Sequence, residues 1–459
     1  MIMAGHRFFA FLFFLFLVFH CTGQSRILMD PSGKNHLPYS FLSPLRKVWI
    51  PDNYIRKQKE FRGFWVSTIG NLDFPRCKTA AEFRRAYTNL IRKAASAGFN
   101  AVIFQVRPCN DTFYPSRFSP WSRYLSGAEG YPLENGFDPL AFMIAEAHRY
   151  GLEFHAWLNP YRIVGRTKLT KDAYLRTLHP TNYAVRNPDK VLSVPLSNGG
   201  NMLFLNPGEP DVLVFLLNTI QELLLYTPDA IHIDDYFYPY EPMENQDLKT
   251  FRTYGKAGMT IDDFRRYSTD RMVQTVSLLI RRYNALKKTQ IKFGVSPFGI
   301  WANKPRPKPV SPEAIAKWQK LQTSPLGSET KGHQAYFELY ADTRKWVKNG
   351  WVDYITPQIY WGFANPAAPY AAVVDWWIEN IRGTNVALYI GIGAYRMGVN
   401  TDCLRHDELP GQLRYIQKYP EVKGVSFFSS RSMFGNPPAA RKAALKTVFE
   451  QYWGGKYIP

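Results

Sequence analysis

Residues 230–239 read AIHIDDYFYP, a short apolar run that leads into two adjacent acidic residues. Isoleucine alternates with other side chains up to the adjacent pair Asp234 and Asp235. Because side chains along a β-strand point alternately to its two faces, the two isoleucines share one face, and His232 and Asp234 share the other. In a closed barrel the apolar face contacts the surrounding helices, so we expect His232 and Asp234 to point into the barrel.

Seven further short apolar or β-branched runs accompany this one along the chain. They alternate with amphipathic helical segments, which is typical of βαβ units and a parallel sheet. The eight predicted strands are 61–68, 101–106, 152–158, 230–234, 291–296, 352–358, 386–391 and 424–428. The helical segments include 80–97, 139–150, 211–226, 261–287, 336–348, 370–382 and 438–451. Eight such units predict closure into a (β/α)8 TIM barrel.

The connections between these segments differ in length at the two ends of the strands. Helix-to-strand joins are short and marked by Gly or Pro, whereas the joins 107–138, 159–210 and 297–334 after strands are long. In a barrel these long loops all lie on the C-terminal face, where barrel enzymes place their sites. An open doubly wound sheet is the alternative, but residues 69–72 after the first strand lack its Gly-rich turn. We therefore expect an α/β barrel with long C-terminal loops, preceded by an N-terminal extension.

The N-terminus has the composition of an export signal. Residues 8–19 are apolar, fewer than the roughly 20 that a bilayer span needs, and small residues follow them. We expect a signal peptide over residues 1–23, an extension rich in Pro, Ser and Lys over 24–59, and the barrel over 60–455. Acylation of Cys21 would make a lipoprotein, although His20 stands where a small residue is usual.

The composition indicates a folded, basic protein. Of 459 residues, 46% are hydrophobic and 20% charged, which excludes a disordered chain. Removal of residues 1–23 takes away one arginine and no acid, so the net charge falls from +20 to +19. For an exported protein this predicts an anionic partner such as an acidic glycan, a cell-wall polymer or a membrane surface. A basic surface without a partner is the alternative, and the compartment disfavours nucleic acid.

No metal or cofactor is predicted. His155 and His232 lie on separate strands, and the sequence has no HxH, HExxH or CxxC cluster, P-loop or GxSxG elbow. The odd number of cysteines after residue 23 excludes a disulfide framework, while a bridge between Cys77 and Cys109 in neighbouring loops stays open.

Polar and aromatic side chains gather at the predicted strand ends. Asp234 is the first catalytic candidate because an inward carboxylate is costly to bury without a partner or a purpose. Asp235 is the second; a turn in which both carboxylates accept backbone N–H groups is the alternative. Hydrogen-bonding groups mixed with flat rings suit a sugar, although packing in the barrel core is the alternative for any single residue. The candidate substrate-binding residues are Gln105, Arg107, His155, Trp157, Asn159, Tyr161, Arg162, His232, Tyr236, Ser296, Gln358, Tyr360 and Trp361.

Six of these strand-end motifs together resemble the bacterial glycosyl hydrolase-like 10 family. They are EFRGFWV at 60–66, FQVRP at 104–108, HAWLNPYR at 155–162, IHIDDYFYP at 231–239, GVSPFG at 294–299 and DYITPQIYW at 353–361. The resemblance covers about residues 61–428 and implies an exported barrel glycosidase, periplasmic or associated with the outer membrane. One family member, linked to cell division, cleaves peptidoglycan strands stripped of their stem peptides. The family's aspartate pair falls on Asp234 and Asp235, and its motifs also include Gln105, Arg107, Asn159, Arg162, Gln358 and Tyr360.

Glycoside hydrolysis normally requires two carboxyl groups, about 5–5.5 Å apart for retention and about 6.5–9.5 Å apart for inversion. We expect Asp234 to act as nucleophile or as base for water, and a second acid to donate the proton. Asp235 is the simplest choice, and the reserves are Asp111, Glu241, Glu338 and Asp342.

Denuded peptidoglycan also suits the basic charge, since each muramic acid carries a lactyl carboxylate. Arg107 and Arg162 are expected to bind it through bidentate hydrogen bonds; internal salt bridges to Asp111 or Asp235 are the alternative. Two other functions stay open, a glycosidase for another polysaccharide and a glycan-binding barrel without catalysis.

Overall fold

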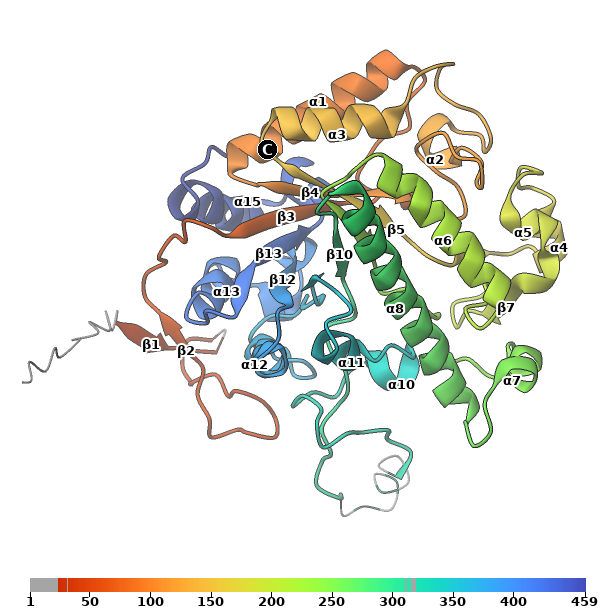
Figure 1. Cartoon of the computed structure of the whole chain (residues 1–459). Helices are drawn as coiled ribbons and strands as arrows, with labels where there is room; N and C mark the ends of the chain where they lie inside the picture. The colour runs from red at the N-terminus through yellow and green to blue at the C-terminus, as the bar shows by residue number, and fades with distance from the viewer. Residues whose placement is uncertain (1–23, 31, 310, 312, 314, 316–318) are drawn as a thin grey trace, which may run out of the picture.

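Eight parallel strands close into a barrel in the computed structural model of the protein (Figure 1). The structure describes residues 24–30, 32–309, 311, 313, 315 and 319–459, so the expected signal peptide and Cys21 lie outside the described residues. Around the ring the order is β10-β11-β12-β13-β3-β4-β5-β9, and the predicted TIM barrel is confirmed. The strands are β3 (Phe61–Val66), β4 (Ala101–Arg107), β5 (Glu153–Leu158), β9 (Ala230–Ile233), β10 (Lys292–Val295), β11 (Tyr354–Ile355), β12 (Ala387–Gly393) and β13 (Val422–Phe428).

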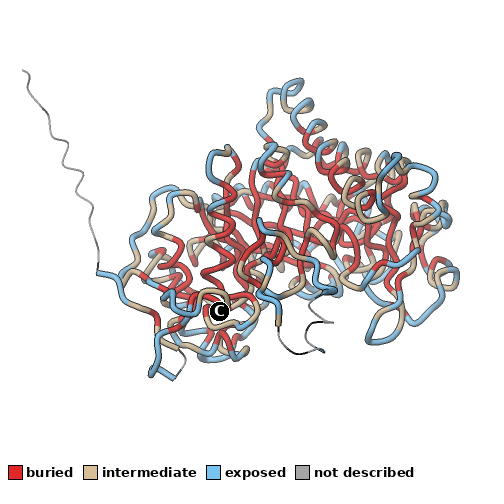
Figure 2. Tube along the Cα trace, turned by 90° about the horizontal axis from the view of Figure 1, so that it is seen from below, coloured by how far each residue is buried: buried red, intermediate tan, exposed pale blue. Residues whose placement is uncertain are grey.

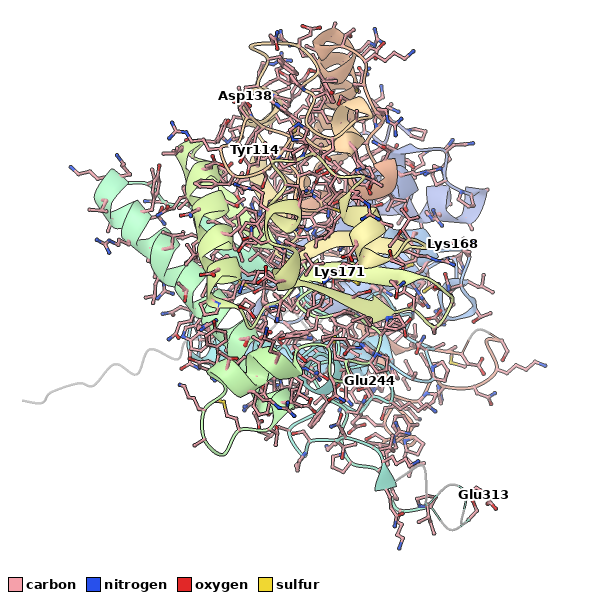
Figure 3. All side chains as sticks on the ribbon, turned by 90° about the vertical axis from the view of Figure 1, so that its right-hand side faces the viewer. Tyr114, Asp138, Lys168, Lys171, Glu244 and Glu313 are labelled. Atoms are coloured by element: carbon pink, nitrogen blue, oxygen red, sulfur yellow. The ribbon has the colours of Figure 1, made fainter. Side chains whose placement is uncertain are left out.

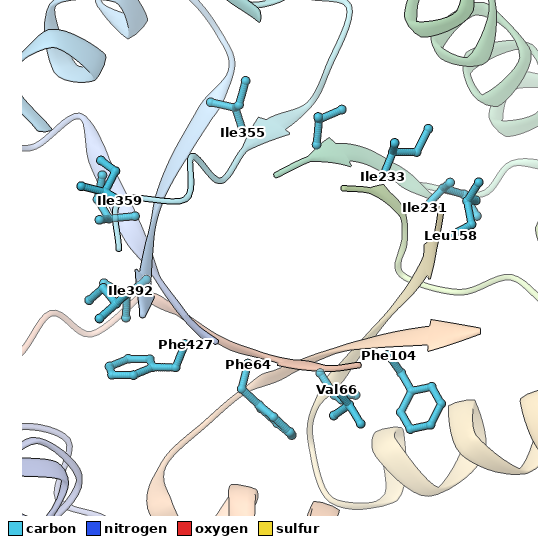
Figure 4. Packing of buried hydrophobic residues seen from close by; sticks show 14 of the residues in the cluster. Phe64, Val66, Phe104, Leu158, Ile231, Ile233, Ile355, Ile359, Ile392 and Phe427 are labelled. Atoms are coloured by element: carbon cyan, nitrogen blue, oxygen red, sulfur yellow. The ribbon is translucent and has the colours of Figure 1, made fainter. Parts of the chain in front are cut away.

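Strand alternation separates the apolar exterior of the barrel from its interior. Figure 4 shows Phe64, Phe104, Ile231 and Ile233 pointing away from the centre of the ring, toward the helices. The interior is crossed by hydrogen bonds between strands that are not neighbours, since Trp65 on β3 donates to His232 on β9 at 3.3 Å. The inward direction expected of His232 is therefore confirmed.

The helices between the strands largely follow the sequence expectation. The side chain of Thr79 caps α1 by accepting from the Glu82 amide, and Gly98, with a φ of 94°, ends that helix. A capping box of Thr260 and Asp263 begins α8. The surrounding helices are α1 (Ala80–Ala97), α3 (Pro139–Arg149), α6 (Pro210–Leu225), α8 (Ile261–Lys287), α10 (Ala335–Glu338), α11 (Thr343–Lys348), α12 (Tyr370–Ile381), α13 (Glu408–Ile416) and α15 (Ala439–Lys446).

Two helical segments differ from the expectation. The predicted helix 336–348 is broken into α10 and α11, because Tyr340 takes a left-handed φ of 51° and Asp342 caps α11 by accepting from the Lys345 amide. The helix α13 was not predicted, since Pro410 and Gly411 inside it are poor helix formers.

The long connection 159–210 after β5 contains a small antiparallel sheet that was not predicted from the sequence. Its strands β6 (Arg162–Thr167), β8 (Asn201–Leu205) and β7 (Val191–Pro195) pair in that order. The short helices α4 (Lys171–Leu175) and α5 (Tyr183–Arg186) lie within it. This insertion stands at the C-terminal face of the barrel beside β5 and β9. The other short helices are α2 (Arg123–Ser126), α7 (Leu248–Tyr254) and α14 (Ser430–Phe434).

The N-terminal segment is fastened to the side of the barrel. Its strands β1 (Ser25–Ile27) and β2 (Trp49–Pro51) pair antiparallel. Arg26 and Arg46 bind Asp407 and Asp375 at 3.0 and 3.1 Å, and the apolar side chains of the segment join the main core. Figure 2 shows buried residues running through the barrel strands and exposed turns around the outside.

Two further features of the described residues bear on the sequence expectations. None of their helices is both long and apolar enough to cross a membrane. Cys77, Cys109 and Cys403 are buried free thiols, so the bridge left open between Cys77 and Cys109 is not formed.

Candidate active site

A pocket of about 500 Å³ lies at the C-terminal ends of the barrel strands. Its lining combines two carboxyl groups with several hydrogen-bonding groups and many aromatic rings. The side chains lining it include Trp65, Ser67, Gln105, Trp157, Arg162, Asp234, Asp235, Tyr236, Tyr240, Ser296, Phe298, Gln358, Tyr360, Tyr395 and Phe428. Such a concave site with a few convergent polar groups is typical of a ligand-binding or catalytic centre.

Asp234 is held by donors on both of its carboxylate oxygens. The Asn159 amide donates to Oδ1 at 2.9 Å and to Oδ2 at 3.1 Å, and the Trp157 indole donates to Oδ2 at 3.1 Å. The backbone amide of Tyr236 donates to Oδ1 at 3.2 Å. The Arg162 guanidinium lies 3.7 Å from Oδ2, at ion-pair distance. Burial raises the pKa of Asp234 above its usual value, and the Arg162 charge and these hydrogen bonds oppose that rise.

Asp235 has a different environment, although it is the next residue. The Gln358 amide donates to its Oδ1 at 2.8 Å, and the Tyr240 hydroxyl donates to its Oδ2. Burial, together with the neighbouring charge of Asp234, raises the pKa of Asp235 to about 6. A carboxyl group with such a pKa can give and take a proton near neutral pH.

The reserve acids lie elsewhere. Asp111 accepts from Ser122, Glu241 from Ser197, and the other two serve helix starts at α10 and α11. Within the part of the chain that the structure describes, Asp234 and Asp235 are the only carboxyl groups lining the pocket.

A chain of hydrogen bonds runs through the barrel below the pocket. The indole N–H of Trp65 donates to Nε2 of His232, so this nitrogen is an acceptor. It therefore also accepts a hydrogen bond from the Ser296 hydroxyl at 2.9 Å. Nδ1 of His232 therefore carries the proton and donates to the Tyr354 hydroxyl at 2.9 Å. That hydroxyl donates to His155 at 2.8 Å, and His155 donates to Glu153 at 2.9 Å.

This direction of the hydrogen bonds leaves the Ser296 oxygen as an acceptor toward the pocket. His155 and His232 belong to this chain of hydrogen bonds in the barrel floor, and through it they orient Ser296. Burial lowers the pKa of His232 well below its usual value, which agrees with a neutral ring.

The candidate substrate-binding residues fall into three groups. Seven line the pocket, and Trp361 lines an adjoining pocket of about 350 Å³ that shares Phe298, Gln358, Tyr360 and Tyr395 with the first. Five others lie behind the lining. The seven are Gln105, Trp157, Arg162, Tyr236, Ser296, Gln358 and Tyr360, and the five are Arg107, His155, Asn159, Tyr161 and His232.

The two arginines differ in position. Arg162 lines the pocket, stacks on Tyr236 at 4.3 Å and faces Asp234, rather than Asp111 or Asp235. Arg107 is fully buried and donates to the Asn159 carbonyl and the Asn110 side chain at 2.8 and 2.6 Å. It supports the loop after β4 from behind the pocket.

Gln105 is oriented by its own loop. Its Oε1 accepts the backbone amides of Thr68 and Ile69, both at 3.0 Å, so the direction of the side-chain amide is fixed. Its Nε2 is buried without a protein partner among the described residues and belongs to a side chain that lines the pocket. It is an unpaired donor behind the pocket surface, since the Gln105 side chain is fully buried.

Several lining residues were absent from the sequence candidates. Trp65 lies within a motif that was already singled out, Tyr240 directly follows the motif 231–239, and Phe428 ends the last predicted strand. Their positions at strand ends were therefore a usable signal. Phe298 also stands in such a motif, whereas Tyr395 follows β12 in a loop that no pattern marked. Among the described residues no group of three or more His, Cys, Asp or Glu is placed to hold a metal ion.

Similarity to known proteins identifies the family of this chain. The family described as Glycosyl hydrolase-like 10 matches residues 60–405. The chain is 38% identical over 392 residues to Glycosyl hydrolase YngK of Bacillus subtilis (strain 168). The matched region covers 83% of this chain and 70% of that protein. It is 33% identical over 448 residues to Glycosyl hydrolase DigH of Escherichia coli (strain K12). That matched region covers 92% of this chain and 94% of that protein.

A solved structure, the spore cortex-lytic enzyme SleL of Bacillus megaterium QM B1551, is 11% identical with a TM-score of 0.42, covering 89% of this chain and 77% of that one. The family match extends over most of the barrel and includes the strand ends that carry the aspartate pair. The chain belongs to the glycosyl hydrolase-like 10 family and is a glycosidase.

Proposed function

We propose that the protein is an exported glycosidase that cleaves a bacterial cell-wall glycan, namely peptidoglycan strands lacking stem peptides. Its catalytic groups in this proposal are Asp234 and Asp235. The observation that carries the proposal is that two buried carboxyl groups with different environments share one aromatic-lined pocket. Asp234 is bound by several donors and by a guanidinium, whereas Asp235 has a pKa of about 6. Such a pair provides an anion and a proton donor.

The adjoining pockets support a polymeric substrate. The two adjoining pockets share four side chains, so pocket-lining residues continue beyond the aspartate pair. Rings such as those of Tyr360, Trp361 and Tyr395 suit the C–H faces of successive sugars. The seated glycan therefore extends past the residue at the aspartates.

The charge beside the pocket supports an anionic glycan. The insertion 159–210 contributes Arg162, Gly165 and Met202 to the pocket. It contains seven Lys or Arg and three Asp or Glu residues. Figure 3 labels Lys168 and Lys171 on this insertion, and Lys168 is exposed. The net positive charge of this insertion beside the pocket attracts the lactyl carboxylates that peptide-free muramic acids carry.

The test uses the purified full chain. It is incubated with denuded peptidoglycan strands, with peptide-bearing sacculi and with neutral polysaccharides, and the products are identified by mass spectrometry. We expect release of oligosaccharides from the denuded strands and none from the Asp234→Asn variant, which still binds the strands. Cleavage of the neutral polymers alone contradicts the cell-wall assignment. Binding without turnover by the wild type on every glycan supports a non-catalytic barrel instead.

Export is tested separately in the native host. The protein is followed by cell fractionation, and Cys21→Ser is compared with the wild type. We expect the wild type outside the cytoplasm, in the periplasm or with the outer membrane. Loss of membrane association only in Cys21→Ser indicates a lipid anchor, whereas a cytoplasmic protein contradicts the export proposal.

A further inference from the structure

The two carboxyl groups of the pocket belong to consecutive residues at the end of one strand. Asp234 and Asp235 directly follow β9, and within the described residues no third carboxyl group lines the pocket. In the usual double displacement, one carboxylate attacks the sugar carbon while the other protonates the leaving oxygen from a separate position. Both carboxyl groups enter the pocket from the end of the same strand, β9, and no carboxyl group of the described residues faces them from another strand. A nucleophile from the opposite face of the ring is therefore missing among these side chains.

Asp234 is also poorly suited to attack. A carboxylate has about four lone-pair sites. Two donors occupy Oδ1, from Asn159 and from the Tyr236 amide, and two occupy Oδ2, from Asn159 and Trp157. The Arg162 guanidinium lies against Oδ2 as well. An anion held on both oxygens stabilises a nearby positive charge better than it forms a new covalent bond.

We propose that the nucleophile is the substrate's own 2-acetamido group, so the sugar cleaved at its anomeric carbon is a β-linked N-acetylhexosamine. This inference rests on the proposed function and names the mechanism and the sugar at the reacting position. In the first step the acetamido carbonyl oxygen bonds to the anomeric carbon. The bond from that carbon to the glycosidic oxygen breaks, and the leaving oxygen takes the proton of Asp235.

The positive charge then lies on a cyclic oxazolinium, and the Asp234 carboxylate stabilises it. In the second step Asp235, now ionised, removes a proton from water, and the water oxygen bonds to the anomeric carbon. The bond to the carbonyl oxygen breaks and returns the acetamide. Two inversions at one carbon give a product with retained configuration, and Asp235 regains its proton.

The lining around the pair suits such a group. Trp65, Trp157 and Phe428 pack together beside Asp234 and offer an apolar wall for the acetamide methyl. The Gln105 Nε2 is a buried donor without a protein partner among the described residues, and the Ser296 oxygen is an acceptor. The Ser296 oxygen offers an acceptor to a polar group of the sugar, whereas the Gln105 donor lies behind the pocket surface because that side chain is fully buried.

The first test changes only the acyl group of the substrate. Denuded strands are chemically N-deacetylated and then treated with either acetic or trifluoroacetic anhydride, so the reacetylated strands control for the chemistry. We expect the reacetylated strands to be cleaved like native strands, and the N-trifluoroacetyl strands at least about 100-fold more slowly because their carbonyl oxygen is a weak nucleophile. The new reducing ends should first appear as the β-anomer in a rapid NMR measurement.

The outcomes separate this inference from the proposed function. Equal rates on acetyl and trifluoroacetyl strands, or a first product of inverted configuration, overturn the mechanism while the function stands. Failure to cleave native or reacetylated strands contradicts the function itself.

The second test assigns the two aspartates. A disaccharide thiazoline, a stable analogue of the cyclic intermediate, is titrated calorimetrically into the wild type and two variants. We expect tight binding by the wild type, roughly 100-fold weaker binding by Asp234→Asn because the anion is lost, and a much smaller loss for Asp235→Asn. Circular dichroism checks that both variants are folded. Equal losses for the two variants, or weak binding by the folded wild type, contradict the assignment.

Discussion

Asn159 donates its side-chain amide to both carboxylate oxygens of Asp234, at 2.9 and 3.1 Å. The amide is itself fixed, because its Oδ1 accepts the backbone N–H groups of Tyr161 at 3.2 Å and Arg162 at 2.7 Å. Asn159 therefore links the end of β5 to the carboxylate that follows β9. Although it does not line the pocket, it determines where Asp234 points, and this makes it a positioning residue.

The substitution Asn159→Ala tests this link. Without the amide, Asp234 loses two hydrogen bonds and is free to turn, so we expect kcat on denuded strands to fall roughly 100-fold with little change in KM. Asn206→Ala is the matched control, because Asn206 is buried and bonded to Thr250 outside the pocket. It should lose stability while keeping kcat. A similar fall of kcat in both variants would mean that general loosening, rather than the position of Asp234, limits the rate.

Activity should depend on pH through both aspartates. If Asp235 acts as the proton donor it must be protonated, and its pKa of about 6 predicts that kcat/KM falls as the pH rises above 6. Asp234 must be ionised, and since burial raises its pKa above 3.8, kcat/KM should also fall at acid pH, with a midpoint above 3.8.

The hydroxyl of Tyr240 lowers the pKa of Asp235, so Tyr240→Phe should move the alkaline limb to higher pH. Tyr395→Phe is the control, because Tyr395 lines the pocket while Asp235 takes its hydrogen bonds from Tyr240 and Gln358. The measurement is kcat/KM between pH 4 and 9. An alkaline limb that stays in place in Tyr240→Phe argues against Asp235 as the donor.

Much of the fold was predictable because its signals are local. The capping residues Thr79 and Gly98 mark both ends of α1, and Thr260 marks the start of α8. The break between α10 and α11 has one local signal, the capping residue Asp342, and one tertiary contact. The hydroxyl of Tyr340 accepts from Arg265 of α8 at 2.9 Å, and no pattern near Tyr340 reveals that partner.

The sequence predicted which side chains of the candidate site point into the barrel. It did not predict which of them line the pocket and which lie behind the lining. Alternation along β9 correctly indicated that Asp234 points into the barrel. It did not distinguish a lining residue from one that supports the lining, since Trp157 and His232 are paired across β5 and β9 and only Trp157 lines the pocket. That distinction comes from partners on distant strands, such as Tyr354 beneath His232. Tyr240 reaches Asp235 only because the loop after β9 folds back over it.

The glycine at position 294 makes room for the hydrogen-bond chain in the barrel floor. Gly294 is paired with Tyr354 across β10 and β11, and a Cβ at this position would overlap the Tyr354 ring. Gly294→Ala should therefore displace a ring whose hydroxyl joins His155 and His232, and it should lower the free energy of unfolding by about 1–3 kcal/mol. Gly165→Ala is the control, since nothing lies within 4 Å of its added Cβ. Urea denaturation compares the two; equal stabilities contradict the proposed overlap.

Glu408 should make the stability of the fold depend on pH. It is fully buried at the start of α13, and burial raises its pKa from 4.5 to about 7. Its Oε1 accepts from the Phe363 amide and from Gln412, whereas its Oε2 has no hydrogen-bond partner among the described residues. Between pH 4.5 and 7 the folded state thus binds more protons than the unfolded state. Its contribution to stability is complete below pH 4.5 and is lost as the pH rises through 7.

Glu408→Gln is neutral at every pH and keeps an acceptor for the Phe363 amide, so it should lack this loss. Relative to the wild type, we expect its free energy of unfolding to increase by roughly 1–3 kcal/mol between pH 4.5 and pH 8. Glu244→Gln is the control, because Glu244 is exposed before α7 (Figure 3) and should leave the pH profile unchanged. Urea denaturation at pH 4.5, 6 and 8 measures the difference. Parallel profiles for Glu408→Gln and the wild type would show that this carboxyl group is ionised in the folded protein, because a charge already present at acid pH adds no slope above it.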